Sequence, residues 1–280
     1  MLKDKTTNEK TGLLGSVGDD FYGDLYASLL NKEDIVPVFE KYDDINTGVC
    51  CVFCHNRDRG HITDLGASTL ISKEYMERVW EKLSDVTLIY TELFILKHRK
   101  DLVFMLAEHA LADDRQFGFN LPSFYFIENF TQDILLLWSY VDIAFANVAE
   151  AIFFGKLLGL VENEEDITTL CINLAKIPKK NKNKKRVVVI TCGPEPAHVA
   201  EYDHENGLLT NYGSYLPEYV DENLIVDTNG AGDAFAGGFL SKFVRNSSLD
   251  QCMNAGHWAA SVIIQTRGCK IPDDLTYQEM

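Results

Sequence analysis

A glycine-rich run that ends in a carboxylate is the part of this sequence best suited to chemistry. It reads Asp-Thr-Asn-Gly-Ala-Gly-Asp from Asp227 to Asp233. Unsatisfied backbone N–H groups at the start of a following helix, with the positive end of its dipole, would form a seat for an anion. Gly230 and Gly232 have no Cβ, so a phosphate could approach the backbone closely. Asp233 would repel that phosphate, which makes sense if it is the base that deprotonates a hydroxyl attacking phosphorus.

The flanking segments would position this run. Leu224–Val226 predicts the end of a buried strand. The segment from Ala234 to Val244 predicts a helix with three residues on one face: Phe235, Gly238 and Phe239. A glycine turn that only caps the helix, without any ligand, is the alternative interpretation.

The run from Val226 to Leu240 resembles the signature of the PfkB (ribokinase-like) carbohydrate kinases. Its residues at 227–233 are similar to those of the adenosine kinases within this family. A second segment resembles the family's Gly-x-x-Gly-x-Asp-x-aromatic-Gly motif, with matches at Gly15, Gly18, Asp20, Tyr22 and Gly23. The resemblance implies an ATP-dependent kinase that transfers the γ-phosphate to the 5′-hydroxyl of adenosine, with Mg²⁺ as a cofactor. It also suggests K⁺, because related kinases hold a monovalent cation near the loop Arg267–Cys269.

The resemblance assigns roles around the phosphate that is transferred. Asp233 is the catalytic base. Gly230, Ala231 and Gly232 supply the anion hole, and Asn229 contacts the nucleoside.

The ATP side of the site is implied at Asn147, Thr191, Gly193 and His257. Asn147 and Glu150 match the family's Asn-x-x-Glu motif, whose glutamate organises Mg²⁺ through water; a carboxylate there can hold a hard cation. The same pair would form a capping box at a helix start, and both roles can hold at once. Thr191 and Gly193 match a Thr-x-Gly that lies against the nucleotide phosphates. His257 either contacts the adenine of ATP or is a packed helix histidine.

The acceptor side is implied at Phe94 and Arg59. Phe94 falls where adenosine kinases keep an aromatic residue that stacks on the purine, and a buried core phenylalanine is the alternative. Arg59 falls where the family carries a lid arginine near the transferred phosphate, and a solvated hairpin charge is the alternative. Glu92 stands where the family often has a glycine, and nothing in the sequence explains it.

Strands and helices alternate from Val86 to the C-terminus, which predicts a mainly parallel sheet with helices on both faces. The resemblance implies a ribokinase-like three-layer α/β/α fold with a partial small lid, as one domain over residues 1–280. Asn147, Thr191 and Asp233 each follow a predicted strand, so they can converge at one edge of the sheet. The predicted strands are 47–54 and 61–65, which form a lid-related hairpin within about 45–66, and 86–90, 116–121, 138–145 and 186–190. The other predicted helices cover about 20–30, 72–83, 97–110, 166–175 and 249–263.

Composition and charge exclude several classes of protein. The chain has 280 residues, of which 46% are hydrophobic, so it can bury a sizeable core. Its net charge of −16 at pH 7 argues against nucleic acid as a partner. No apolar run is long enough to span a membrane and the first residues show no signal peptide, so we expect a cytoplasmic monomer with reduced thiols. The basic run 176–186 is a nuclear-import signal or, as we favour, a solvated loop.

The resemblance begins at about Gly15 and does not cover the family's opening strand, which carries an aspartate for the ribose hydroxyls. It also leaves out a Gly-Gly segment that holds the nucleoside. Only a short polar tail precedes Gly15, so we expect unpaired backbone groups and exposed apolar surface. Two further hypotheses therefore stand beside an active adenosine kinase: a catalytically impaired isoform or paralogue that only binds nucleotide, and another PfkB sugar kinase.

Overall fold

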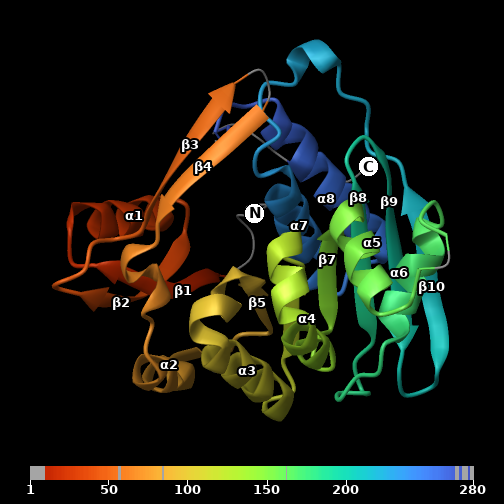
Figure 1. The fold of residues 1–280 in the computed structure, drawn as a ribbon, viewed down its shortest axis with the longest axis horizontal. Coiled ribbons are helices and arrows are strands. Elements are labelled where there is room, and N and C mark those ends of the chain that lie inside the picture. Colours follow the sequence, from red (N-terminus) through yellow and green to blue (C-terminus); the bar gives the residue numbers. More distant parts are fainter. Residues whose placement is uncertain are drawn as a thin grey trace. The chain divides into compact units, whose positions relative to one another are not determined.

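The computed structural model describes residues 10–55, 58–83, 85–161, 163–268, 271–272 and 277 (Figure 1). The chain forms two compact units. The larger unit comprises residues 87–94 and 103–280, and the smaller unit comprises residues 3–86 and 95–102. Within the described ranges, no helix is long and apolar enough to cross a membrane.

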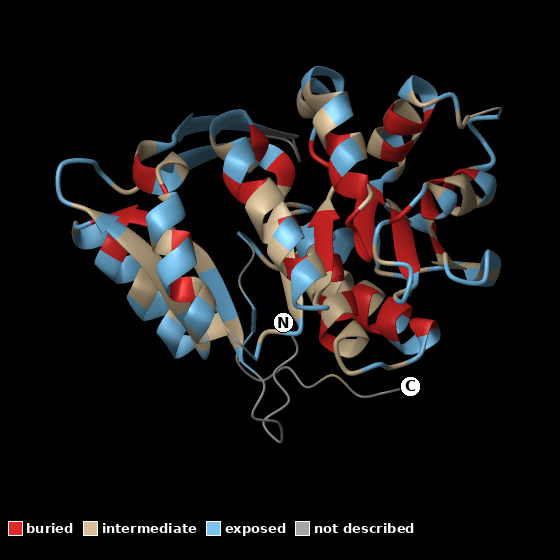
Figure 2. Ribbon diagram, turned by 90° about the horizontal axis from the view of Figure 1, so that it is seen from below, coloured by how far each residue is buried: buried red, intermediate tan, exposed pale blue. Residues whose placement is uncertain are grey.

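A six-stranded sheet lies at the centre of the larger unit, in the order β10-β9-β8-β7-β6-β5. Its parallel strands are β5 (Leu88–Glu92), β6 (Gln116–Asn120), β7 (Ile143–Asn147) and β8 (Arg186–Cys192). Two antiparallel strands complete it: β9 (Glu195–Asp203) and β10 (Leu208–Tyr215). β6, β7 and β8 are buried on both faces over most of their length, as Figure 2 shows by colour, whereas β5 is only partly buried. The predicted mainly parallel sheet is confirmed.

Helices cover both faces of this sheet. They are α4 (Phe124–Trp138), α5 (Val148–Leu157), α6 (Ile167–Lys176), α7 (Ala231–Phe243), α8 (Leu249–Ile264) and the later part of α3 (Leu96–Ala112). Phe145 of β7 and Val189 of β8 pack with Phe239 of α7 and Met253 of α8. Side chains alternate along a strand, so the neighbouring residues face the other way, where α5 and α6 contact β7 and β8 (Figure 1).

The smaller unit contains two separate pairs of strands. β1 (Thr11–Gly18) and β2 (Ile35–Tyr42) are parallel and are connected by α1 (Phe21–Lys32). β3 (Val49–His55) and β4 (Asp58–Asp64) form the predicted antiparallel hairpin, and α2 (Lys73–Trp80) follows. The described residues of the chain also include four short 3₁₀ helices: η1 (Gly66–Thr69), η2 (Glu81–Leu83), η3 (Leu93–Ile95) and η4 (Glu222–Leu224).

The motif turn at Asp20 is held by its own side chain. The carboxylate of Asp20 accepts hydrogen bonds from the N–H groups of Thr47 and Gly23, both at 2.8 Å. These bonds lower the pKa of Asp20, with the Thr47 bond as the largest cause. They also connect the start of α1 to the segment that leads into the hairpin. Asp20 therefore has a structural role in this unit.

β1 and α1 form the N-terminal part of the smaller unit. β1 begins at Thr11, so the residues just before Gly15 belong to a strand and are not only a polar tail. Ladder bonds to β2 keep this segment extended. On α1, Phe21 is 72% exposed and Leu29 is 47% exposed.

Two predicted strands are corrected in the larger unit. Trp138 ends α4 instead of opening a strand, because its indole N–H donates to the carbonyl of Leu174 at 3.1 Å, and β7 begins only at Ile143. Leu224–Val226 is not a buried strand: Leu224 ends η4 and is 54% exposed. The N–H of Val226 donates at 2.8 Å to the carbonyl of Ile264, which has no partner inside α8 because the helix ends there.

The packing of α7 against α8 allows a stability prediction. A Cβ added at Gly238 would lie 2.3 Å from the carbonyl oxygen of Ala255 and 2.8 Å from Cβ of Ala259. We expect Gly238→Ala to lower the free energy of unfolding by about 1–3 kcal/mol, the usual cost of overpacking. Gly237→Ala is the matched control, because an added Cβ there meets no atom within 4 Å. That variant should gain roughly 0.5–1 kcal/mol through helix propensity, and urea denaturation of both would reveal equal shifts if the close packing is wrong.

Candidate active site

The carboxyl ends of β7 and β8 bring two predicted site residues side by side. Asn147 ends β7 and pairs in register with Thr191 of β8. The hydroxyl of Thr191 donates to the carbonyl of Ala146 at 3.4 Å. β5 runs parallel to these strands, so its last residue, Glu92, lies at the same edge of the sheet.

Asn147 and Glu150 form the capping box at the start of α5. The N–H of Glu150 donates to Oδ1 of Asn147 at 2.8 Å, and the N–H of Asn147 donates to Oε2 of Glu150 at 3.1 Å. Burial raises the pKa of Glu150 to about 7, although the hydrogen bonds from Asn147 oppose this rise. A cation beside such a half-buried carboxyl would favour its ionised form. The donor chemistry of Glu150 therefore fits Mg²⁺.

The glycine-rich run forms the turn before α7. Gly230 caps the helix with a φ of +75°, which residues with a side chain rarely adopt. The N–H of Ala231 donates to the carbonyl three residues back at 3.3 Å. In the described part of the chain, the N–H groups of Gly232 and Asp233 donate to no backbone carbonyl. These two amides, more than that of Ala231, are open to an anion at the positive end of the helix.

Hydrogen bonds to the C-terminal end of α8 and to the residues that follow it hold this turn in place. The carboxylate of Asp227 accepts from the N–H of Asn229 at 2.9 Å and from the N–H of Gly268 at 3.4 Å. The N–H groups of Val226 and Asp227 both donate to Ile264, at 2.8 and 3.2 Å. Asn229 thus lies in a turn whose backbone is fixed at both ends.

Carboxyl groups from three elements converge near the start of α7. Asp233 is exposed in the first turn of that helix. Burial raises the pKa of Glu92 to about 8, and the negative charges of Asp233 and Glu150 raise it further. Tyr90, two residues earlier on β5, also has a raised pKa because of burial and of the charges of Glu92 and Asp233. Asp233, Glu92 and Glu150 are therefore close enough to interact electrostatically.

These carboxyls do not form a metal cage by themselves. Among the described residues, no three histidine, cysteine or acidic side chains are arranged to hold one metal ion. A phosphate-bound magnesium ion needs only one or two protein carboxylates, because phosphate oxygens and water supply the other ligands. The arrangement is thus compatible with a cation that arrives with a nucleotide.

The remaining predicted site residues differ in how accessible they are to a ligand. Gly193 follows β8 with a φ of +63°, and an added Cβ would meet no atom within 4 Å, so its backbone is accessible. Phe94 is 49% exposed and touches Phe126 edge-on, with ring centroids 5.1 Å apart, which excludes the core alternative. Arg59 lies in β4 in register with Cys54, and its side chain lies outside the described residues.

His257 has a packed environment. Its Nε2 lies 3.1 Å from the carbonyl oxygen of Tyr215, and its ring meets Phe235 edge-on with centroids 5.1 Å apart. Burial lowers the pKa of His257, although the hydrogen bond to Tyr215 opposes this. A neutral, packed histidine accounts for these contacts, and a further contact to a nucleotide remains a prediction.

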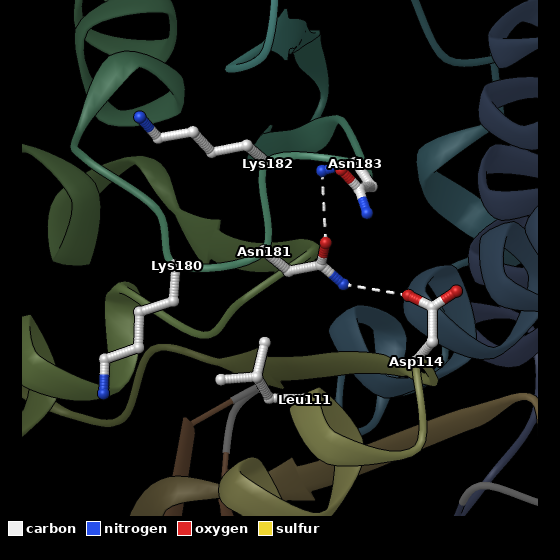
Figure 3. A pocket seen from close by; sticks show the side chains of 6 residues that line it. All are labelled: Leu111, Asp114, Lys180, Asn181, Lys182 and Asn183. Carbon is white, nitrogen blue, oxygen red and sulfur yellow. Dashed lines mark hydrogen bonds between the residues drawn. The ribbon is translucent and has the colours of Figure 1, made fainter.

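A pocket of about 410 Å³ lies at the other end of the parallel strands, away from their carboxyl ends (Figure 3). It is lined by Leu111, Asp114, Lys180, Asn181, Lys182 and Asn183. The side-chain N–H of Asn181 donates to Oδ1 of Asp114 at 3.1 Å, and the side chains of Lys180 and Lys182 point away from this bond. The lining segments precede β6 and β8, so the pocket is at the amino ends of the strands. It is therefore separate from the edge that carries Asn147 and Thr191.

Open amides at the start of α7, in a unit built on a mostly parallel α/β sheet, are features of a class of phosphotransferases. The chain belongs to the pfkB family of carbohydrate kinases, whose family model matches residues 6–275. Adenosine kinase 2 of Arabidopsis thaliana is 30% identical over 265 residues, which cover 94% of this chain and 74% of that protein. The adenosine kinase of Dictyostelium discoideum is 31% identical over 274 residues, which cover 97% of this chain and 77% of that protein.

Solved structures agree with this family. Anopheles gambiae adenosine kinase in complex with P1,P4-di(adenosine-5) tetraphosphate superposes with a TM-score of 0.83 and 28% identity, over 92% of this chain and 74% of that one. Schistosoma mansoni adenosine kinase in complex with 2-fluoroadenosine superposes with a TM-score of 0.84 and 27% identity, over 94% of this chain and 75% of that one. The expected ribokinase-like fold is confirmed.

Glu92 and Tyr90 were not assigned to the site from the sequence. The available signal was an acidic residue at the end of an otherwise apolar strand, at a position where ligand sites form in such sheets. A solvated strand end would explain the same residue equally well. Only the proximity of Asp233 and Glu150 distinguishes the two interpretations.

Proposed function

We propose that this chain is an ATP-dependent adenosine kinase, which transfers the γ-phosphoryl group of ATP to the 5′-hydroxyl of adenosine and yields ADP and AMP, a purine-salvage reaction. The observation that carries this proposal is the start of α7. There, the open amides of Gly232 and Asp233 lie at a helix N-terminus beside the exposed Asp233 carboxylate. Adenosine kinases about 30% identical along 94% of the chain support the choice of acceptor.

Asp233 has the role of base in the proposed reaction. As the 5′-oxygen bonds to the γ-phosphorus, the bond from phosphorus to the bridging oxygen breaks and the hydroxyl proton passes to Asp233. The backbone N–H groups of the anion hole, which Gly230, Ala231 and Gly232 form, hold the charge that develops on the phosphoryl oxygens. This stabilisation needs no reorganisation, because the turn is already fixed by α8.

The nucleotide is held at the carboxyl ends of β7 and β8. Asn147, Thr191, Gly193 and His257 contact ATP in this proposal, and Glu150 organises Mg²⁺ through water. When bound, Mg²⁺ neutralises charge on the phosphate oxygens. A K⁺ ion near Arg267 and Gly268 is a further part of the proposal, which the family resemblance supports.

Phe94 and Asn229 of the larger unit hold the nucleoside in this proposal. Phe94 stacks on the purine through its exposed ring, and Asn229 contacts the ribose. The hairpin of β3 and β4, within residues 45–66, acts as part of a lid, and its Arg59 contacts the transferred phosphate.

Product analysis tests this function. The purified chain is given ATP and Mg²⁺ with either adenosine or ribose, and the products are separated by chromatography. AMP formed only with adenosine supports the proposal, whereas ribose phosphate indicates another PfkB sugar kinase. Nucleotide binding without product indicates a protein that binds nucleotide and has lost turnover. Thermal unfolding with and without adenosine and ATP measures binding independently, because ligands that bind only the folded chain raise its stability.

We also propose that the protein is a cytoplasmic monomer. In this proposal the basic run 176–186 is part of the folded unit and is not a nuclear-import signal. Four of its basic residues are held elsewhere in the unit: Lys179 by Asp142, Lys184 by Asp114, Lys185 by Glu201 and Arg186 by backbone carbonyls. An import signal must be read as an accessible segment. These contacts would have to break first, which supports the loop interpretation.

A further inference from the structure

His257 of α8 is held by groups from two other elements of the larger unit. Its Nε2 lies 3.1 Å from the carbonyl oxygen of Tyr215, the last residue of β10. Its ring meets that of Phe235 at an interplanar angle of 80°, with centroids 5.1 Å apart. Phe235 belongs to the first turns of α7, the helix that begins at the proposed phosphate seat. The imidazole is therefore fixed in position and orientation beside this helix.

The bond to Tyr215 decides where the hydrogen of the imidazole ring lies. A backbone carbonyl oxygen can only accept a hydrogen bond, so Nε2 of His257 carries the hydrogen and donates it. Burial lowers the pKa of His257, although the bond to Tyr215 opposes this, so the ring is neutral at pH 7 and has a single N–H. Nδ1 then keeps its lone pair, and within the described ranges no hydrogen bond reaches it. His257 is only partly buried, so it presents a fixed acceptor to a ligand.

A fixed acceptor discriminates between purines by the group at C6 of the base. Adenine has a 6-amino group, which donates hydrogen bonds, whereas hypoxanthine and guanine have a 6-oxo group, which only accepts them. An amino group that faces Nδ1 forms a hydrogen bond. An oxo group in the same place leaves two acceptors opposed and unpaired, which costs binding free energy.

We propose that His257 determines the specificity for the phosphate donor, because its Nδ1 accepts a hydrogen bond from the 6-amino group of ATP and disfavours 6-oxopurine nucleotides such as ITP. This inference rests on the proposed function, in which His257 contacts the nucleotide. His257 takes no part in the transfer of the phosphoryl group and acts only on binding of the base. The choice of acceptor should therefore be independent of His257.

The test measures kcat/KM with adenosine as the acceptor and one of three donors: ATP, ITP or purine riboside 5′-triphosphate, which has no substituent at C6. The wild type should prefer ATP to either analogue by about tenfold or more, the effect of a hydrogen-bonding group that is left unpaired. His257→Phe keeps a ring against Phe235 but has no acceptor, so its preference should fall to about twofold or less. His257→Asn supplies an amide oxygen close to the backbone and should restore part of the preference. A wild-type preference in His257→Phe would overturn the proposal.

His204 provides a matched control. Its Nε2 lies 3.1 Å from the carbonyl oxygen of Ala175, and its ring meets that of Tyr202 edge-on, with centroids 4.9 Å apart. It follows β9 beside the amino end of β8, where Tyr202 pairs with Arg186, away from the strand ends that carry the site. His204→Phe makes the same change in a similar environment and should keep the wild-type preference. Loss of the preference in both phenylalanine variants would count against the proposal, since the effect would then not come from Nδ1 of His257.

Two measurements keep this test separate from the proposed function. Calorimetry without an acceptor should show that the wild type binds ATP about tenfold or more tightly than ITP and that His257→Phe does not, even if neither chain phosphorylates adenosine. NMR of chains with ¹⁵N-labelled histidine should show that Nε2 of His257 is protonated and that the Nδ1 signal shifts with ATP and not with tripolyphosphate. If Nδ1 carries the proton, the proposal fails whatever the activity. If adenosine is phosphorylated equally well from ATP and ITP, the proposed function stands and this inference fails.

Discussion

We expect phosphorylation of adenosine to slow by a factor of about 10²–10⁴ when Asp233 is replaced by asparagine, which is the usual contribution of a general base. The amide nitrogen of asparagine cannot take the proton of the 5′-hydroxyl, so kcat falls. The backbone amides at the start of α7 are unchanged, so the Kd for ATP should remain within a few-fold of the wild type. Steady-state kinetics and calorimetry measure the two effects separately.

A matched control for this substitution is available on the neighbouring helix. Asp250 lies exposed in the first turn of α8, as Asp233 does in α7, and its carboxylate accepts from the hydroxyl of Tyr215 at 2.5 Å. Asp250→Asn removes the same charge from a helix start outside the site and should retain wild-type kcat. Equal turnover by Asp233→Asn and Asp250→Asn would remove the role of base from Asp233.

We expect the free energy of unfolding to fall by about 3–5 kcal/mol when Lys179 is replaced by methionine, because a buried ion pair then loses one partner. The side chain of Lys179 is wholly buried and bonds to the carboxylate of Asp142, which also accepts the N–H of Phe117 at 2.8 Å. The ammonium group further donates to the carbonyls of Lys184 and Lys185, at 2.8 and 3.1 Å. Burial lowers the pKa of Lys179 to about 8, which the charge of Asp142 opposes. Urea denaturation at pH 7 measures the loss.

The pH dependence of the Lys179→Met variant has a definite sign. Burial raises the pKa of Asp142, and the loss of Lys179 removes the charge that lowers it. The folded chain then binds a proton at Asp142 more tightly than the unfolded chain does. Its stability should therefore decrease as the pH rises from the ordinary pKa of an aspartate to the raised one.

Lys182→Met provides the control for this loop. Lys182 is exposed, so its replacement should change the free energy of unfolding by less than about 0.5 kcal/mol. The double variant Asp142→Asn with Lys179→Met should lose less than the sum of the two single variants, since no unpaired charge stays buried. If Lys179→Met is as stable as Lys182→Met, the pair does not hold the loop.

Local patterns in the sequence were sufficient for most of the elements that carry the site. The apolar runs at β5, β6 and β8 and the capping residue Asn147 predict strands and a helix start within a few residues. Trp138 misled this kind of prediction, because its aromatic side chain favours a strand while its indole bonds to Leu174 across the fold. α4, β9 and β10 were not predicted, because no recognisable sequence motif adjoins the segments that form them.

The sequence alone identified the family, the glycine turn and the candidate base, because these depend on residue types within one continuous run. Only the tertiary structure decided that Glu92 shares its environment with Asp233 and Glu150, and that Lys179 of the basic loop is buried against Asp142. The reason is physical: backbone bonding and capping act over a few residues, whereas burial and charge coupling join groups far apart in the chain. A carboxyl or an ammonium group has no fixed protonation or role until the fold has chosen its neighbours.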